Sequence, residues 1–184
     1  MGHAAGQRRR AARRPAGTGG VSGARFCRAC GAALETLPLA GRLRLVCAAG
    51  CGHVEWNNPL PVVAALVERD GRIVLARNAA WAEGTFGLIS GFLEAGESPE
   101  DAVAREVAEE LGLVAEAVAL IGVYPFERRN EVIIAYHVVA AGEIVLNEEL
   151  AEVRLIDPEK LRAWDFGTGL AVRDWLARQA SARG

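Results

Sequence analysis

The sequence contains no apolar run long enough to cross a bilayer, and no export signal is readable in it. Its longest uninterrupted apolar runs, such as residues 61–67, fall far below the ~20 residues that a membrane-spanning helix needs. No apolar segment follows the early arginines, as a signal peptide or a twin-arginine signal requires. We therefore expect an intracellular, cytoplasmic protein with no membrane partner.

The body of the chain also lacks an excess of positive charge. Residues 1–20 hold five arginines and no acid, whereas the whole chain has 21 basic and 23 acidic residues. From Val21 onward 16 basic residues face 23 acidic ones, a net charge of −7. Nucleic-acid binding depends on basic side chains that neutralise phosphates. The acidic body therefore predicts no nucleic-acid partner.

Neither length nor composition indicates a fibrous or wholly disordered chain. Hydrophobic residues make up 51% of the 184 residues and charged residues 24%, a balance that can bury one substantial core. This length favours one domain with room for a small appended module. Residues 1–24 are rich in Gly, Ala and Arg without a hydrophobic period, and we interpret them as a disordered basic tail. A transit peptide or a weak electrostatic contact is the alternative.

All four cysteines lie in two short pairs, and a glycine follows each pair. The pairs are Cys27 with Cys30 and Cys47 with Cys51. Four thiolates complete a tetrahedral zinc site, and glycine lets the turns tighten around the metal. Disulfides are the alternative, but they need an oxidising compartment. We expect a structural Zn²⁺ in a zinc ribbon over residues 25–56, with Cys51 as the fourth ligand and His53 as the other candidate.

Hydrophobic periodicity predicts a mixed α/β or α+β domain over residues 60–180. The expected strands are residues 42–47, 62–69, 72–77, 86–90, 118–124, 131–140 and 152–156. Asp70 and Gly71 form a two-residue hairpin signal, and residues 57–61 serve as a linker. A short helix is expected to open at Asp157, and a final helix follows an N-capping Thr168.

The most informative stretch is residues 91–113. Ser98 is a good N-cap, and Pro99 fits the first helical position. Gly112 fits the left-handed position that ends many helices. These signals predict a helix between Ser98 and Gly112, with an apolar side for the core.

The opposite side of this helix gathers Glu106, Glu109 and Glu110 on adjacent turns. Their repulsion costs a few tenths of a kcal/mol per pair, and a hard divalent cation reverses it because Mg²⁺ prefers carboxylate oxygens. Acidic helix faces are commonly just solvated. Here, however, the glutamates belong to a longer pattern. Gly91 is followed after five residues by Glu97, and after seven more residues by Arg-Glu-Val-x-Glu-Glu-x-Gly-Leu. Typical residue usage gives this spacing by chance in roughly one chain in a million.

This stretch matches the Nudix box at every defining position, so the chain resembles the Nudix hydrolases. Three further features resemble the NADH pyrophosphatase-like branch of this family. They are the zinc ribbon, the Trp-Asn-Asn-Pro motif of residues 56–59, and the Ser-Gly-Phe start of the box at residues 90–92. Residues 142–150 are similar to the segment of that branch that carries a late glutamate. The resemblance covers roughly residues 26–178. It implies a mixed β-sheet sandwiched between helices and preceded by the zinc ribbon.

The resemblance also implies a site for Mg²⁺ or Mn²⁺. Glu106 and Glu110 would bind the metal, helped by the backbone carbonyl of Ser90. Glu109 would complete the metal site or take a proton from water. Metal bridging neutralises the repulsion between an acidic site and a diphosphate, and it lowers the pKa of the attacking water.

Further roles follow from the same resemblance. Arg105 would orient the carboxylates by ion pairing, and Glu97 would hold Arg105. Glu149 is the candidate for a further ligand or base, with Glu148 and Glu152 as alternatives in the same loop region.

The implied reaction is hydrolysis of a nucleoside diphosphate linked to another group, giving a nucleoside monophosphate. NADH pyrophosphatases carry Ser-Gln-Pro-Trp-Pro-Phe-Pro-x-Ser after the box, whereas residues 123–131 stand there in this chain and only Pro125 matches. We therefore expect ADP-ribose-like or other dinucleotide substrates to be better than NADH. The candidate substrate contacts are Tyr124, Phe126, Arg128 and Arg129. The arginines are alternatively plain surface charges.

Two other functions remain open on the sequence. One is an NADH or NAD⁺ pyrophosphatase proper, and the other is a non-catalytic module that contacts a partner through its zinc ribbon. The complete box favours the enzyme. Trp56 and Trp81 are interpreted as core residues, with base stacking as the alternative. A homodimer is one assembly that the sequence permits.

Overall fold

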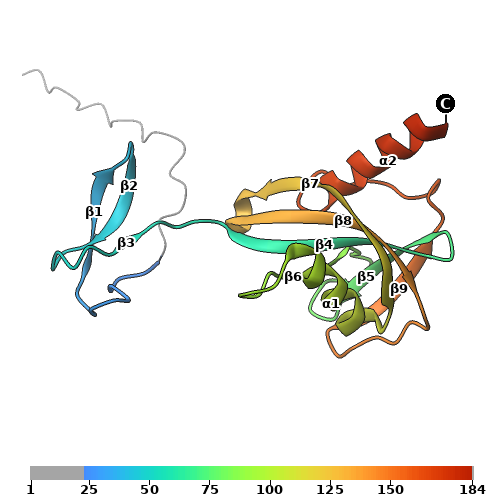
Figure 1. The fold of residues 1–184 in the computed structure, drawn as a ribbon, viewed down its shortest axis with the longest axis horizontal. Helices are drawn as coiled ribbons and strands as arrows, with labels where there is room; N and C mark the ends of the chain where they lie inside the picture. Colours follow the sequence, from blue (N-terminus) through green and yellow to red (C-terminus); the bar gives the residue numbers. More distant parts are fainter. Residues whose placement is uncertain (1–22, 184) are drawn as a thin grey trace, which may run out of the picture. The chain divides into compact units, whose positions relative to one another are not determined.

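A computed structural model describes residues 23–183 of the chain. The expected basic tail, residues 1–24, therefore lies almost entirely outside the described residues. Packing divides the chain into two compact units (Figure 1). The N-terminal unit ends at Asn58, and the C-terminal unit begins at Pro59.

The N-terminal unit is built on a small antiparallel sheet. Its strands are β1 (Leu34–Leu39), β2 (Arg42–Cys47) and β3 (Val54–Glu55), in that spatial order. The alternation of polar and apolar residues predicted β2 with these bounds. Among its described residues, the buried hydrophobic side chains are those of Cys27, Leu45 and Cys47. A unit with so small a core needs a further source of stability, such as a bound metal.

The C-terminal unit is built on one mixed sheet. Its strands are β4 (Leu60–Arg69), β5 (Arg72–Asn78), β6 (Ile89–Phe92), β7 (Val114–Phe126), β8 (Glu131–Ala141) and β9 (Leu150–Ile156). They are ordered β7-β8-β4-β5-β9, and β6 also pairs with β4. The β4–β8 pairing is parallel and the others are antiparallel, so the predicted mixed sheet is confirmed.

Two helices cover opposite faces of this sheet, as Figure 1 shows. They are α1 (Pro99–Leu111) and α2 (Gly169–Arg183). Alternate residues of β4 enter the two cores: Val63, Ala65 and Val67 pack on the α1 side. Ala64 and Leu66 pack on the α2 side. This explains the unbroken apolar run, because β4 is buried on both faces. Within residues 23–183, no helix has the length and hydrophobicity of a membrane span.

Strands β4 and β9 each begin two residues earlier than expected, and three other predicted elements differ more clearly from the structure. The third strand of this unit, β6, begins at Ile89 rather than at residue 86. Strand β7 begins at Val114, four residues early, because pairing with β8 holds its alanine-rich start extended. The helix expected at Asp157 is a turn in which the Lys160 amide donates to the Asp157 carbonyl at 2.8 Å. An acid before a proline also begins turns, so the local signal is ambiguous.

Candidate functional site

The local signals of residues 98–112 place α1. Ser98 Oγ accepts a hydrogen bond from the Asp101 amide at 3.1 Å and donates to Asp101 Oδ2 at 2.7 Å. Gly112 adopts the left-handed conformation, with φ of 67°. The predicted helix and both its caps are confirmed. Tyr136 of β8 adds a tertiary anchor, since its hydroxyl donates to Glu100 Oε1 at 2.9 Å.

Arg105 joins one end of β6 to three carboxylates. Its guanidinium donates to both oxygens of Glu97, at 2.8 and 3.1 Å. The same group reaches Glu106 at 2.7 Å and Glu109 at 3.0 Å. It also donates to the Phe92 carbonyl at 3.2 Å. Hydrogen bonds from Arg105 lower the pKa of Glu97, so this carboxylate stays charged and holds the guanidinium in place.

Gly91 of β6 lies directly against the Glu106 carboxylate. A Cβ atom at this position would overlap the carboxylate carbon and both oxygens of Glu106. The glycine of the motif is therefore required for close approach rather than for a turn. This contact brings the strand backbone and the helix carboxylate to one place.

Glu110 is the buried carboxylate of the cluster, with 8% of its surface exposed. Burial, followed by the charges of Glu106 and Glu149, raises the pKa of Glu110 to about 8. A hydrogen bond with the Ser90 backbone acts in the opposite direction. A buried carboxylate beside two others is stabilised in its charged form when a cation joins them.

The segment between β8 and β9 brings Glu149 to this cluster. The Val145 amide donates to the Leu111 carbonyl at 2.8 Å, and the Asn147 amide donates to the Glu110 carbonyl at 3.3 Å. Asn147 Oδ1 then accepts the Glu149 amide at 3.0 Å. The sequence analysis missed Asn147, although an asparagine that bonds the backbone two residues on is a common turn signal.

The alternatives to Glu149 lie in different surroundings. Glu152, on β9, is paired with Arg77 at 3.5 Å and with Arg154 at 3.2 Å. Glu148 is exposed. Of the three, Glu149 lies near enough to Glu110 for its charge to raise the pKa of Glu110.

The four cysteines form a second candidate site, in the N-terminal unit. Their sulfur atoms all lie within 4.8 Å of one another, and all four are free thiols. Sγ of Cys27 lies 3.6 Å from that of Cys51, and Sγ of Cys30 lies 3.4 Å from that of Cys47. His53 is not part of this group of ligand atoms, and its Nε2 lies 3.8 Å from Oε2 of Glu55. The set of four soft thiolates can hold one metal ion with no open position.

Comparison with known proteins identifies the C-terminal unit. A model of the NUDIX domain matches residues 58–176. The chain belongs to this family. The motif of residues 91–113, which includes α1, lies within the matched range.

Similar proteins include bacterial enzymes named NAD-capped RNA hydrolase NudC. The one from Mycobacterium bovis is 37% identical over 135 residues, which cover 71% of this chain and 41% of that protein. The one from Stutzerimonas stutzeri is 33% identical over 164 residues, covering 86% of this chain and 58% of that protein. This chain thus spans about half the length of these curated relatives.

A solved structure shares the fold. The crystal structure of a NUDIX hydrolase from Nitrosomonas europaea aligns with a TM-score of 0.73 and 22% sequence identity. The alignment covers 87% of this chain and 93% of that one. At this level of identity the likeness concerns the fold alone.

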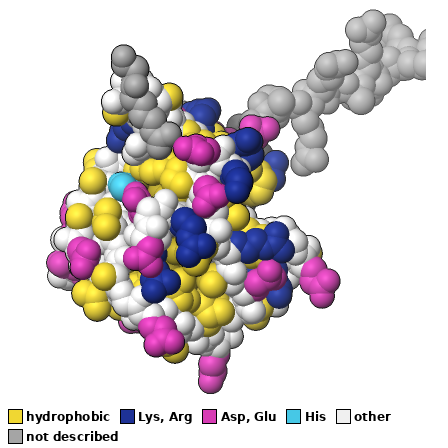
Figure 2. All heavy atoms as spheres, turned by 90° about the vertical axis from the view of Figure 1, so that its right-hand side faces the viewer, with side chains coloured by type: hydrophobic (Ala, Val, Ile, Leu, Met, Phe, Trp, Pro, Cys, Tyr) yellow, Lys and Arg dark blue, Asp and Glu magenta, His cyan; other side chains and the backbone are white. Residues whose placement is uncertain are grey.

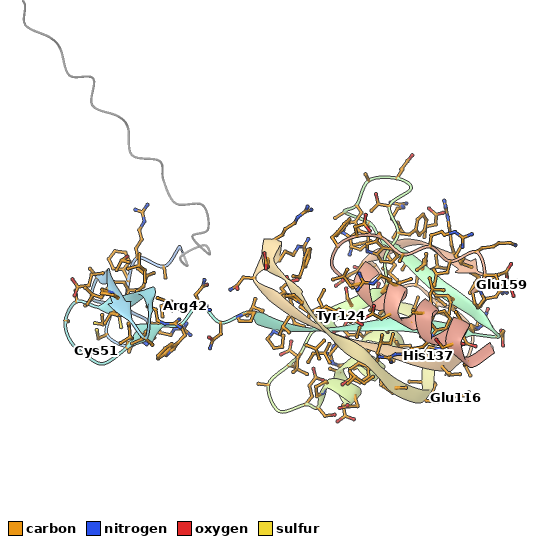
Figure 3. All side chains as sticks on the ribbon, turned by 90° about the horizontal axis from the view of Figure 1, so that it is seen from above. Arg42, Cys51, Glu116, Tyr124, His137 and Glu159 are labelled. Atoms are coloured by element: carbon orange, nitrogen blue, oxygen red, sulfur yellow. The ribbon has the colours of Figure 1, made fainter. Side chains whose placement is uncertain are left out.

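The expected substrate contacts of this Nudix chain are only partly accessible. Tyr124 is 8% exposed, and its hydroxyl donates to Asp174 of α2 at 2.9 Å, so its ring is not free to stack on a base (Figure 3). Phe126 packs against the α2-side core. Arg128 lies over the exposed ring of Phe166, 5.7 Å from its centroid. Arg129 is also exposed, in the 3₁₀ turn Glu127–Arg129 between β7 and β8.

The core interpretation of the two tryptophans is wrong. Trp56 is 48% exposed and Trp81 is 39% exposed. The ring of Trp81 lies against Gly87, where a Cβ atom would come within 3.1 Å of it. Trp56 and Trp81 both lie in connecting segments outside the strands, where side chains are more often exposed.

Proposed function

We propose that the chain is a metal-dependent Nudix pyrophosphohydrolase that cleaves a nucleoside diphosphate linked to another group, yielding a nucleoside monophosphate. The observation that carries this proposal is the α1 cluster. Buried Glu110, Glu106 against Gly91, and the Arg105 clamp form one acidic site at the end of β6. Family membership and the hydrolases among the relatives support it.

The residues present fit a hard divalent cation, Mg²⁺ or Mn²⁺. Glu106 and Glu110 would hold it, with the Ser90 carbonyl and Glu109 completing the set. These are oxygen donors, and burial together with the charges of Glu106 and Glu149 raises the pKa of Glu110, so a cation bound here would stabilise its charged form. When bound, such a cation lowers the pKa of water and neutralises the diphosphate.

The protein side chains then have distinct tasks. Arg105, fixed by Glu97, holds the carboxylates of Glu106 and Glu109 in orientation and supplies the positive charge of the clamp. Glu149, or Glu109 on the exposed side of the helix, accepts the proton of the attacking water. Because these carboxylates titrate as a group, activity is expected to rise with pH as the group loses protons.

We also propose that residues 25–56 form a zinc ribbon and residues 60–180 the hydrolase domain. Cys27, Cys30, Cys47 and Cys51 would bind one structural Zn²⁺, as a closed set of four soft ligands. Zinc binding requires all four groups as thiolates, so it would release protons from this cluster. Four free thiols are consistent with the reducing cytoplasm, where we place the activity.

For the substrate, we propose an ADP-ribose-like compound or a dinucleotide, rather than NADH itself. The relatives' name concerns RNA capped with NAD, a dinucleotide. Residues 123–131 carry no tryptophan, and both arginines of this segment are exposed. Arg128 lies over the Phe166 ring, whereas Arg129 makes no such ring contact within the described residues. A guanidinium there suits a ribose or terminal phosphate of a compact conjugate.

The test is a comparison of kcat/KM for NADH, NAD⁺, ADP-ribose, FAD and a dinucleoside polyphosphate. We expect ADP-ribose or another non-NADH compound to lead. Arg129→Gln should raise KM for that compound and leave kcat nearly unchanged, because the residue would touch the group beyond the diphosphate. A preference for NADH of ~10-fold or more, about 1.4 kcal/mol, over every other compound would contradict the substrate proposal.

A further inference from the structure

The charge of the chain is divided unequally between its two units. Residues 1–58 contain nine arginines and two glutamates, a net charge of +7. Residues 59–184 contain 12 basic and 21 acidic residues, a net charge of −9. On the face of the C-terminal unit seen in Figure 2, side chains of both signs are interspersed. Five of the nine arginines lie in residues 1–22, outside the described residues, and residues 23–58 carry four arginines and two glutamates, a net charge of +2. A polyanionic partner is therefore attracted by the N-terminal unit and repelled by the C-terminal unit.

Two of these arginines share one face of the small sheet. In the β1–β2 pairing, Arg42 lies opposite Leu39 and Arg44 lies opposite Leu37. Residues opposite each other in a sheet point to the same side, and so do residues two apart on one strand. Both leucines are exposed, by 37% and 40%. The two arginine positions are about 7 Å apart, and the exposed Glu35, opposite Val46, lies at the far end of the same face.

Trp56 completes this face. The guanidinium of Arg44 lies over the indole ring, 4.6 Å from its centroid, and donates to the Trp56 carbonyl at 2.7 Å. Trp56 nonetheless remains 48% exposed. An indole that is held by a cation and still open to solvent is a rigid platform for a further flat group.

The face is separate from the cysteine cluster. Arg42 begins β2 and Cys47 ends it, which separates them by about 17 Å. Figure 3 shows Arg42 and Cys51 on different sides of the N-terminal unit. Arg28 is occupied elsewhere, in an ion pair with Glu55 at 2.8 Å.

We propose that this ribbon face, formed by Arg42, Arg44 and Trp56, binds single-stranded nucleic acid. The indole stacks on a base, exposed Arg42 contacts a neighbouring phosphate, and Arg44, which is already bound to Trp56, holds the ring in place. An acidic protein would satisfy the arginines but would leave the exposed indole without a stacking partner, so nucleic acid fits the whole face better. The inference goes beyond the proposed hydrolysis and reverses the expectation drawn from the acidic charge of the body.

The test measures binding of the full chain to a fluorescein-labelled oligouridine of about 12 nucleotides, by anisotropy without divalent cations. Trp56→Ala should weaken binding about tenfold or more, whereas Trp56→Phe, which keeps a ring, should retain most of it. Arg42→Gln should lower the slope of log K against log salt by about 0.7. Arg72→Gln is the matched control, because it removes one exposed arginine from the C-terminal unit. It should change neither quantity.

Zinc content and hydrolysis of ADP-ribose are measured on the same variants. Both should be unchanged, which separates a failure of this inference from a failure of the proposed function. Absence of oligouridine binding at low salt would overturn the inference. So would wild-type affinity in both Trp56→Ala and Arg42→Gln, or an equal loss in Arg72→Gln. Competition by oligoglutamate as strong as by unlabelled oligouridine would assign the face to an acidic protein instead.

Discussion

The two candidate metal sites of this chain differ in ligand chemistry, in burial and in their relation to the surrounding fold. The N-terminal unit offers four thiols within 4.8 Å in a unit with few buried hydrophobic side chains. The C-terminal unit offers carboxylates on a helix that is already held by caps, by Tyr136 and by a full core. Metal bound by the cysteines would therefore stabilise the N-terminal unit, whereas the fold of the C-terminal unit holds the carboxylates in place without a metal.

This difference explains why the two sites are expected to take different metals for different purposes. Thiolates select a soft or borderline ion, and a closed set of four leaves no position for water. Carboxylates select hard ions that keep part of their water shell, which is where hydrolysis takes place. Removing ligands from the two sites should thus produce opposite results.

The largest effect is expected at the carboxylates. Glu106→Gln or Glu110→Gln keeps the size of the side chain and removes its charge, so turnover of ADP-ribose should fall by at least ~10²-fold. Folding and zinc content should not change. Glu116→Gln, on the exposed side of β7, is the matched control and should be as active as wild type. Near-normal turnover in both the Glu106→Gln and the Glu110→Gln variants would contradict the assignment of these residues as metal ligands.

The thiolate site should show the reverse. Cys47→Ser should lose zinc and the ordered structure of the N-terminal unit, because metal binding supplies about 10–16 kcal/mol in comparable small domains. Turnover of ADP-ribose should stay within about threefold, since the hydrolase core of α1 and its sheet is a separate unit. Metal analysis and two-domain thermal unfolding provide the measurements. Disulfides in place of zinc in the purified wild type would contradict the ribbon.

A smaller loss is expected when the clamp is loosened but kept charged. Arg105→Lys cannot reproduce the fork that reaches Glu97, Glu106 and Glu109 together. We expect a loss of roughly 10- to 100-fold in activity or in metal affinity, as for other residues that orient ligands. Raising the Mg²⁺ concentration should recover part of the rate. Arg72→Lys serves as the control, and equal rates for the two variants would contradict the clamp.

The smallest effect concerns the stability of the protein without divalent metal. The pKa of Glu110 is about 8 in the folded chain against an ordinary 4.5, so the folded state holds this proton more tightly. Stability is therefore lost as pH rises from about 4.5 through about 8. Glu110→Gln should flatten the dependence of stability on pH. Added Mg²⁺ should restore the stability of the wild-type protein at high pH but should not stabilise the Glu110→Gln variant. Each kcal/mol corresponds to about 2–4 °C in Tm. Equal pH profiles for wild type and Glu110→Gln would contradict the cluster.

The Nudix site could be predicted from the sequence because its signals are local. The caps of α1, the helical spacing of its glutamates and the glycine of β6 all lie within residues 91–113. Local signals also determined the bounds of β2 and the β4–β5 hairpin, where Asp70 and Gly71 adopt the positive φ values of a two-residue turn.

The remaining features depend on contacts between distant segments. Hydrogen bonds of Asn147 to the Glu149 amide and to the Glu110 carbonyl bring Glu149 close to Glu110. The hydroxyl of buried Tyr124 donates to Asp174, which lies 50 residues further along the chain. Neither spacing nor periodicity reports such contacts. Trp56 was misinterpreted because aromatic residues are usually buried, whereas here an arginine holds the ring at the surface.

The most direct test of the central claim uses wild-type protein freed of Mg²⁺ and Mn²⁺ by dialysis, with its zinc content verified. Formation of AMP from ADP-ribose is followed as Mg²⁺ is added back. We predict no AMP before addition and a saturable rise afterwards, absent in Glu110→Gln. AMP formed at the same rate without Mg²⁺ or Mn²⁺, or none formed from any compound of the nucleotide panel with either ion, would contradict the assignment of α1 as a metal-dependent hydrolytic site.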